Sequence, residues 1–153
     1  MGFFLGLFLT LGWLAAHAPA AALQPDPRLA QLQKFFKKYN CPVGKLAPSF
    51  LRAADQYRID WRILPSIALV ESGGGRRYRR NNIFGWANGR VGFKSIDRSI
   101  YLVADKLANS KYYRGKSLQG VLATYNPVPG YVETVQRVMA ELSVPPRSIA
   151  FAD

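Results

Sequence analysis

The chain has 153 residues, of which 49% are hydrophobic, so it is long and apolar enough to build the core of one domain. It carries 21 Lys plus Arg against 9 Asp plus Glu, and this net charge of +12 favours anionic partners such as nucleic acid, a membrane surface or an acidic polymer. The single cysteine, Cys41, excludes an internal disulfide, and we expect it to be a small buried apolar residue.

Residues 1–22 differ from the rest of the chain because they contain no Asp, Glu, Lys or Arg. The apolar run from Phe3 to Ala16 is short for a membrane span, and Ala20-Ala21-Ala22 offers a small-x-small cleavage pattern. We therefore expect a secretory signal peptide that is cut near Leu23. Because the segment begins without Lys or Arg, retention as an N-terminal membrane anchor is the alternative. Both readings predict a periplasmic or extracellular protein of the cell envelope, for which wall polymers and lipid head groups are better candidate partners than nucleic acid.

Cleavage of this signal would remove His17, the only histidine of the chain. The mature chain could then form neither a His-ligated zinc site, nor a Ser-His-Asp triad, nor a Cys-His nucleophile pair. We therefore expect no metal and no cofactor, and a chemistry that depends on carboxylates, hydroxyls and backbone groups. We also expect a monomer.

Hydrophobic periodicity and capping residues predict six helices and a mainly α fold. The first helix begins at a good N-cap, Asp26, followed by Pro27, and ends near Asn40. Ser95 and Ser117 are the N-caps of two later helices. The predicted helices cover residues 26–40, 49–58, 61–72, the two segments that follow these serines, and 132–142. The predicted organisation is an N-terminal helix and linker over 23–45, a domain over 46–142 and a tail over 143–153.

The dipeptide Asn88-Gly89 lies between two apolar and aromatic runs, and this pattern predicts a small β-hairpin around residues 83–94. On such a strand Phe84 and Trp86 alternate with Gly85, so both aromatic side chains would point to the same face. That face is either part of the core or the wall of a binding cleft.

Glu71 is the candidate catalytic residue, because it ends an apolar helix in which it shares one face with Leu64, Ile67 and Ala68. Burial on that face and the helix macrodipole both disfavour an anion near the helix C-terminus, so we expect a raised pKa. A raised carboxyl pKa is the direction that a general acid needs. The alternative is an incidental buried or capping carboxylate.

Three further features have both a functional and a structural interpretation. The basic residues after the helix, Arg76, Arg77, Arg79 and Arg80, form either a solvated loop or a substrate-facing rim. Asp97 is the reserve carboxylate for catalysis, or a favourable charge in the first turn of a helix. Tyr125 is in phase with Leu118 and Leu122, so it is either a core residue or a catalytic helper.

The order of these motifs resembles the lysozyme-like peptidoglycan hydrolases. Glu71-Ser72-Gly73 is followed by Asn82-x-Phe84-Gly85, then by Phe93-x-Ser95, and later by Tyr125-Asn126. The set is most similar to the bacterial β-N-acetylglucosaminidase domains related to flagellar muramidases, and the lytic transglycosylases are near cousins. The resemblance covers residues 46–142 and implies an α+β lysozyme-like fold.

The resemblance implies an exported glycosidase that cleaves the β-1,4 glycan of peptidoglycan, with Glu71 as general acid and Tyr125 beside it. It places Phe84, Gly85 and Trp86 in the wall of the sugar cleft, and we expect further substrate contacts from Ser72, Asn82 and Asn126. The basic rim could hold acidic stem peptides or anionic wall polymers. The alternatives are a lytic transglycosylase or muramidase that cuts the neighbouring bond, and an inactive wall-binding module.

Two departures from the family pattern matter. Gly74-Gly75 replaces the bulkier residue that often follows Glu-Ser-Gly, so we expect a looser loop there. Residues 81–94 contain no Asp or Glu, although the second carboxylate of the family usually lies in or near the hairpin. We therefore expect Glu71 to act as both acid and base, with the 2-acetamido group of the substrate in place of a second carboxylate.

Overall fold

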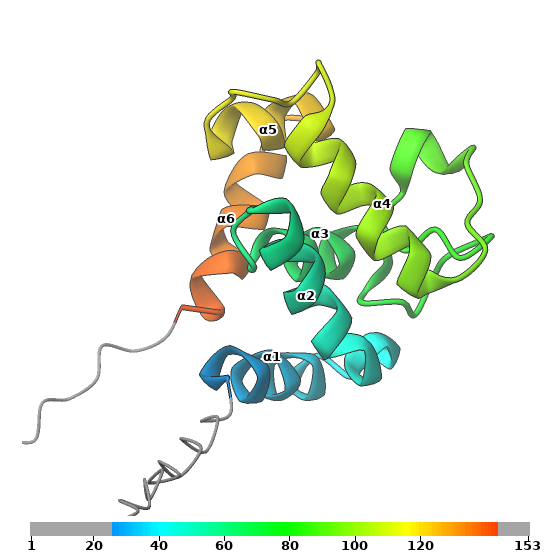
Figure 1. Cartoon of the computed structure of the whole chain (residues 1–153), viewed down its shortest axis with the longest axis vertical. Helices are drawn as coiled ribbons and strands as arrows, with labels where there is room; N and C mark the ends of the chain where they lie inside the picture. Colours follow the sequence, from blue (N-terminus) through cyan, green and yellow to red (C-terminus); the bar gives the residue numbers. More distant parts are fainter. Residues whose placement is uncertain (1–25, 144–153) are drawn as a thin grey trace, which may run out of the picture.

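The computed structural model describes residues 26–143 and consists mainly of helices, as the sequence predicts (Figure 1). The expected signal peptide, and the tail after Ser143, lie outside the described residues. The α-helices are α1 (Pro27–Lys38), α2 (Ala47–Tyr57), α3 (Ile63–Ser72), α4 (Ile96–Asn109), α5 (Leu118–Tyr125) and α6 (Tyr131–Glu141), with the short 3₁₀ segments η1 (Pro42–Leu46) and η2 (Trp86–Gly89). None of the helices within residues 26–143 has both the length and the apolar character that crossing a membrane requires.

Three of the helices, α1, α4 and α5, begin where the capping residues predict. The side chain of Asp26 accepts a hydrogen bond from the Arg28 N–H, Ser95 accepts one from Arg98, and Ser117 accepts one from Gly120. Each of these bonds satisfies an N–H group that the first helical turn leaves without a partner.

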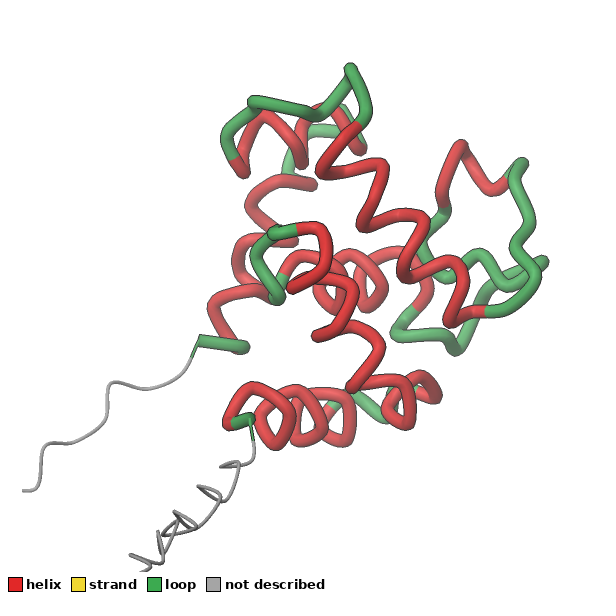
Figure 2. The backbone as a smooth tube through the Cα atoms, in the orientation of Figure 1, coloured by secondary structure: helices red, strands yellow, loops and turns green. Residues whose placement is uncertain are grey.

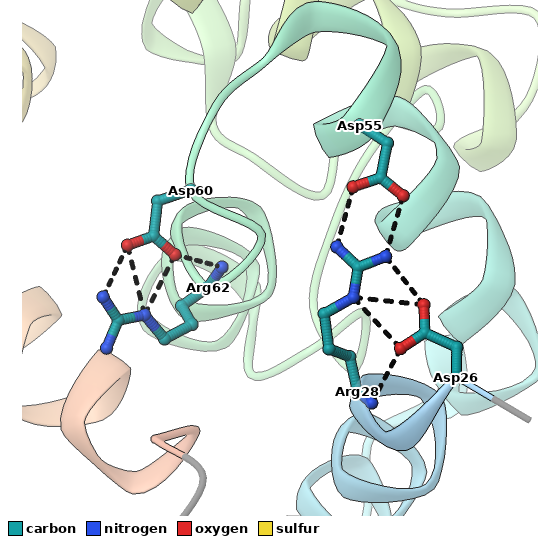
Figure 3. Close-up of polar contacts among 5 residues, drawn as sticks. All are labelled: Asp26, Arg28, Asp55, Asp60 and Arg62. Carbon is teal, nitrogen blue, oxygen red and sulfur yellow. Dashed lines mark hydrogen bonds and ion pairs between the residues drawn. The ribbon is translucent and has the colours of Figure 1, made fainter.

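Ion pairs join the start of α1 to α2. In Figure 3 the guanidinium of Arg28 lies between two carboxylates and binds Asp26 at 2.7 Å and Asp55 of α2 at 2.7 Å. Asp60 lies in the connection before α3, where it accepts from the Arg62 N–H at 3.0 Å and also pairs with the Arg62 guanidinium. These contacts hold the start of α1 on α2 and order the connection before α3.

The core surrounds α3, which lies at the centre of Figure 1 and packs against both α2 and α6. Leu64, Ile67 and Ala68 of α3 are fully buried. This burial follows from the composition of α3, which is apolar on nearly all sides. Such a helix is stable only when its neighbours cover it. Packing on all sides therefore holds helix α3 in place. Glu71 lies at its C-terminal end, at the edge of the core.

Three glycines end α3 and start the loop that follows. Gly73, Gly74 and Gly75 all have left-handed backbone conformations, with φ of 63°, 65° and 85°. A Cβ at Gly74 would lie 2.2 Å from the Cys41 sulfur, and a Cβ at Gly75 would lie 2.7 Å from Val43. The expectation of a loose loop is therefore wrong, because these glycines allow a tight turn to pack on η1. Cys41 is buried as predicted, and burial raises the pKa of its thiol.

The β-hairpin expected around residues 83–94 is also wrong. Figure 2 shows a long connection between α3 and α4, and η2 occupies its middle. The only bridge among the described residues joins Arg79 to Asn82. Ala87, Asn88 and Gly89 all have positive φ, so the Asn-Gly signal is used in a left-handed turn rather than between two strands.

The side-chain amides of Asn81 and Asn82 hold this connection together, in place of the backbone hydrogen bonds that a hairpin would form. Asn82 donates to the carbonyls of Trp86 and Val91 at 3.0 and 2.9 Å, and accepts from the Trp86 N–H at 2.9 Å. Asn81 donates to the carbonyl of Phe93 at 2.9 Å. Asparagine side chains commonly compete with regular secondary structure in this way, and here they close the loop.

Candidate active site

Two adjoining hollows form a groove on the surface, and Gly85 and Asn88 lie in the walls of both. The first hollow has a volume of about 330 Å³, and we call it the aromatic half. The second has a volume of about 560 Å³, and we call it the basic half. The aromatic half is lined by Trp86, Ala87, Tyr112, Tyr113, Thr124 and Tyr125, and the basic half by Glu71, Ser72, Arg77, Tyr78, Arg79, Asn82 and Gly89, besides the two shared residues.

Glu71 lies where the two halves meet. It is the second-last residue of α3, it lines the basic half, and its carboxylate lies against the backbone of Gly85. The side chain is partly buried, and this burial raises the pKa of its carboxyl group, as the sequence predicts. A carboxyl group with a raised pKa, open to a groove, can carry a proton to a bound ligand.

Tyr131, the first residue of α6, lies close enough to Glu71 to influence the pKa of its carboxyl group. Its hydroxyl is buried and has no hydrogen bond of normal geometry to any described residue. Burial, followed by the charge of Glu71, raises the pKa of Tyr131, so this hydroxyl keeps its proton. The Tyr131 hydroxyl in turn favours the ionised form of Glu71. It lowers the pKa of Glu71 and so partly offsets the increase caused by burial. Sequence reasoning missed Tyr131, because no local pattern connects the start of α6 to the end of α3.

Tyr125 lies beside this pair, but its hydroxyl is engaged elsewhere. It donates to the backbone carbonyl of Phe84, and its ring is stacked on that of Tyr131 at 6.2 Å with an interplanar angle of 5°. Burial, with a smaller effect from the neighbouring Tyr131 and Glu71, raises the pKa of Tyr125 well above its ordinary value. The predicted tyrosine is therefore close to Glu71, and it holds the Phe84–Gly85 backbone in place.

In the aromatic half, the ring of Trp86 packs against two tyrosine rings. Trp86 lies 6.0 Å from Tyr113 and 5.7 Å from Tyr125, measured between ring centroids. Tyr112 adds a fourth ring that is 63% exposed. The sequence predicted Trp86 as a wall residue but missed the Tyr112-Tyr113 pair, whose adjacent rings in an irregular segment were the available signal.

Phe84 is not a wall residue, contrary to the expectation. Its side chain is fully buried and packs on Phe50 at a centroid distance of 6.3 Å. The expectation assumed a strand, in which residues two apart share a face. The chain turns at Ile83-Phe84 instead, so Phe84 enters the core and Trp86 enters the groove.

The predicted polar contacts have structural partners inside the protein. Ser72 donates to the Ala68 carbonyl and accepts from the Gly75 N–H, both at 3.0 Å. Asn82 holds the long loop through the bonds described above and, like Ser72, lines the basic half. Asn126 accepts from the Val128 N–H at 3.1 Å and lines neither half. Ser72 and Asn82 therefore shape the groove before any ligand arrives, whereas Asn126 does not contribute to its walls.

The four arginines of the predicted rim separate into two pairs. Arg77 and Arg79 line the basic half. The guanidinium of Arg76 packs over Gly73, and the side chain of Arg80 packs on Gly92, so neither of these lines the groove. Asp97, the reserve carboxylate, lies in the first turn of α4 and lines neither half. Glu71 is thus the one acidic residue among the described residues that line the groove.

The described residues contain no cluster of three or more His, Cys, Asp and Glu side chains that could hold a metal ion. Comparison of the sequence with models of known protein families finds no match, and comparison with curated proteins finds no significant match. The fold and the groove therefore define a class only in structural terms: a mainly helical protein whose central helix delivers one carboxyl group to a groove with an aromatic and a basic half.

Proposed function

We propose that this protein is an exported enzyme that cleaves the β-1,4 glycan strands of peptidoglycan, with Glu71 as general acid and base. The observation that supports the proposal is the position of Glu71 at the junction of the two halves of the groove, with a carboxyl pKa raised by burial. A glycan strand that lies along the groove would present a glycosidic oxygen to this carboxyl group. The aromatic half suits sugar rings, whose apolar faces pack on tryptophan and tyrosine.

In the first step the protonated Glu71 gives its proton to the glycosidic oxygen, and the bond from this oxygen to the anomeric carbon breaks. The carbonyl oxygen of the neighbouring 2-acetamido group forms a new bond to the anomeric carbon, which gives a cyclic oxazolinium ion. This substrate-assisted route needs only one protein carboxylate. It fits a groove in which Glu71 is the one acidic lining residue of the described chain.

In the second step the Glu71 carboxylate takes a proton from a water molecule, which attacks the anomeric carbon and opens the oxazolinium ring. The sugar regains its acetamido group, and Glu71 is protonated again. If the C6 hydroxyl of the same sugar attacks instead, the product is a 1,6-anhydro sugar and no water is consumed. The same groove could therefore serve a glucosaminidase, a muramidase or a lytic transglycosylase.

The tyrosines assist without touching the scissile bond in this scheme. The Tyr131 hydroxyl favours the carboxylate form of Glu71, which is the form needed in the second step. Tyr125 holds the Phe84 carbonyl, and so keeps Gly85 against the acid. The burial of the carboxyl group favours the protonated form, which is the form needed in the first step.

Release of dye from labelled cell walls tests the proposal with wild type, Glu71→Gln and Glu133→Gln. Glu133 is an exposed residue of α6 that lines neither half of the groove, so its variant controls for the loss of one negative charge. We expect Glu71→Gln to lose about 10²- to 10⁴-fold in rate, the usual contribution of a general acid, and Glu133→Gln to keep its activity. Equal rates for wild type and Glu71→Gln, or no release by wild type, would contradict the proposal.

Mass spectrometry of the reduced wall fragments identifies the bond. Fragments that end in reduced N-acetylglucosamine indicate a glucosaminidase, and those that end in reduced N-acetylmuramic acid indicate a muramidase. A 1,6-anhydro end indicates a lytic transglycosylase. Wall binding by wild type without any cleavage would favour the inactive wall-binding module.

A further inference from the structure

The two arginines of the basic half, Arg77 and Arg79, form no ion pair with any of the described residues. The ion pairs among residues 26–143 use Arg28, Lys38, Arg62 and Lys106 as their cations. No carboxylate or side-chain hydrogen bond of the described residues engages either guanidinium of the groove. Two cations that line the same hollow repel each other, so an anion bound there would lower the free energy of this site.

The backbone that carries these arginines is held at both ends. The N–H of Arg77 donates to the Ser72 carbonyl at 3.0 Å, and the Arg79 carbonyl accepts from the Asn82 N–H at 2.9 Å. Tyr78 lies between them, lines the same half and is 43% exposed. The segment Arg77–Arg79 is therefore an ordered wall of the groove. Because less conformational entropy is lost on binding to a held segment, it is a better binding element than a free loop.

Glu71, in the same half, does not neutralise the arginines. The ion pairs among the described residues include none between Glu71 and either arginine. The basic half thus presents free guanidinium groups to whatever enters the groove. A guanidinium group suits a carboxylate in particular, because its planar N–H groups can bind both carboxylate oxygens at once.

The two halves differ in the chemistry that they accept. The aromatic half has no charged lining residue, whereas the basic half has two arginines next to the acid. A ligand that fits both halves carries a neutral ring at one end and an anionic group at the other. In peptidoglycan every second sugar is a muramyl residue, which bears a lactyl group and usually a stem peptide with free carboxylates.

We propose that Arg77 and Arg79 bind a carboxylate on the muramyl substituent, either that of the lactyl group or that of the stem peptide. The inference rests on the proposed function, since it takes the glycan strand as the ligand of the groove. It predicts that the basic half binds the muramyl sugar. Only one of the two alternating glycosidic bonds would then lie at Glu71. Neutral chitin-type oligosaccharides would then be poor ligands.

Binding measurements test the inference separately from catalysis, with the Glu71→Gln variant so that no ligand is cleaved. Three soluble ligands are compared: peptide-bearing glycan strands, strands freed of peptides by an amidase, and the freed strands after conversion of their lactyl carboxylates to amides. Each is bound by the parent, by a version with Arg77→Gln and Arg79→Gln, and by a control version with Arg98→Gln and Arg137→Gln. Arg98 and Arg137 are exposed, lie on α4 and α6 and line neither half of the groove, so the control removes the same charge.

We expect the parent to bind at least one of the two acidic ligands about tenfold more tightly than the amidated strands, which corresponds to one good charge-assisted contact. The groove pair of substitutions should remove this preference, and the control pair should keep it. A preference for the freed strands alone indicates the lactyl carboxylate, because in peptide-bearing strands this carboxyl group is bound in an amide. A preference for peptide-bearing strands alone indicates the stem peptide, and a preference for both indicates that the arginines accept a carboxylate from either source. Equal affinity for all three ligands, or equal losses in the groove and control pairs, would overturn the inference. A wild type that binds acidic strands but cleaves none would contradict the proposed function and leave this result standing.

Discussion

The backbone of Gly85 lies directly against the carboxylate of Glu71. A Cβ at position 85 would stand 2.8 Å from Oε2 of Glu71, closer than any real Cβ contact allows. The residue also has a φ of 60°, a conformation that glycine adopts far more readily than other residues. Glycine at this position therefore lets the loop of η2 close on the acid, and this closure brings the aromatic and basic halves of the groove together.

Gly85→Ala should reduce activity more than it reduces stability. We expect the new methyl group to displace the Glu71 carboxylate and to lower the rate of wall cleavage about tenfold or more, since small errors in position are costly in catalysis. The left-handed backbone adds a loss of about 1 kcal/mol in the free energy of unfolding. Gly115→Ala is the matched control, because Gly115 has a φ of 78°, has nothing within 4 Å of its Cβ position and lines neither half of the groove. If both variants lose activity equally, backbone strain and not the contact with Glu71 is responsible.

Glu71→Gln should stabilise the protein at neutral pH. Burial raises the pKa of Glu71 in the folded state above its unfolded value of about 4.3, so the folded protein holds this proton more tightly. Below the pKa of the unfolded state, Glu71 is protonated in both states and does not lower the free energy of unfolding. As pH rises from there through the folded pKa, stability falls, and above the folded pKa the loss is constant.

The gain from Glu71→Gln should therefore be largest near pH 7 and disappear below about pH 4. Melting temperatures of wild type and variant across this range measure it. A difference that does not change with pH would mean that Glu71 titrates normally.

Tyr131→Phe should leave the fold intact and change the pH dependence of activity. The hydroxyl that is removed has no hydrogen bond in the described structure, so its loss should change the free energy of unfolding by less than about 1 kcal/mol. Because the hydroxyl lowers the pKa of Glu71, the variant should raise that pKa further. The alkaline limb of the pH–rate profile, where the general acid loses its proton, should move to higher pH. An unchanged profile would exclude a role for Tyr131 at the acid.

Asn82→Ala should loosen the loop between α3 and α4. Three hydrogen bonds to the backbone are lost, and the carbonyls of Trp86 and Val91 lose their partner, so we expect a loss of about 2–3 kcal/mol in the free energy of unfolding. Asn109→Ala is the control, because Asn109 is exposed and donates only to Asp105, and it should change stability by less than about 0.5 kcal/mol. Chemical denaturation measures both. Equal effects would show that the loop is held by other contacts.

Local features of the sequence determined the helical part of this protein. Apolar spacing and the caps Asp26, Ser95 and Ser117 predicted helix starts that lie within a few residues of those observed. The position of Glu71 at the end of an apolar helix predicted its partial burial and raised pKa. These predictions succeed because helical periodicity and capping depend on residues three or four apart in the chain.

The tertiary structure alone decided the make-up of the groove. The Asn-Gly signal predicted a hairpin, but the hydrogen bonds of Asn82 select a different closure of the loop and send Phe84 into the core and Trp86 into the groove. The packing of α3 on α6 brings Tyr131 to Glu71, and the tight glycine turn directs Arg77 and Arg79, but not Arg76 and Arg80, to the groove. These outcomes depend on contacts between segments distant in the sequence, and no local pattern encodes the free energy that decides between them.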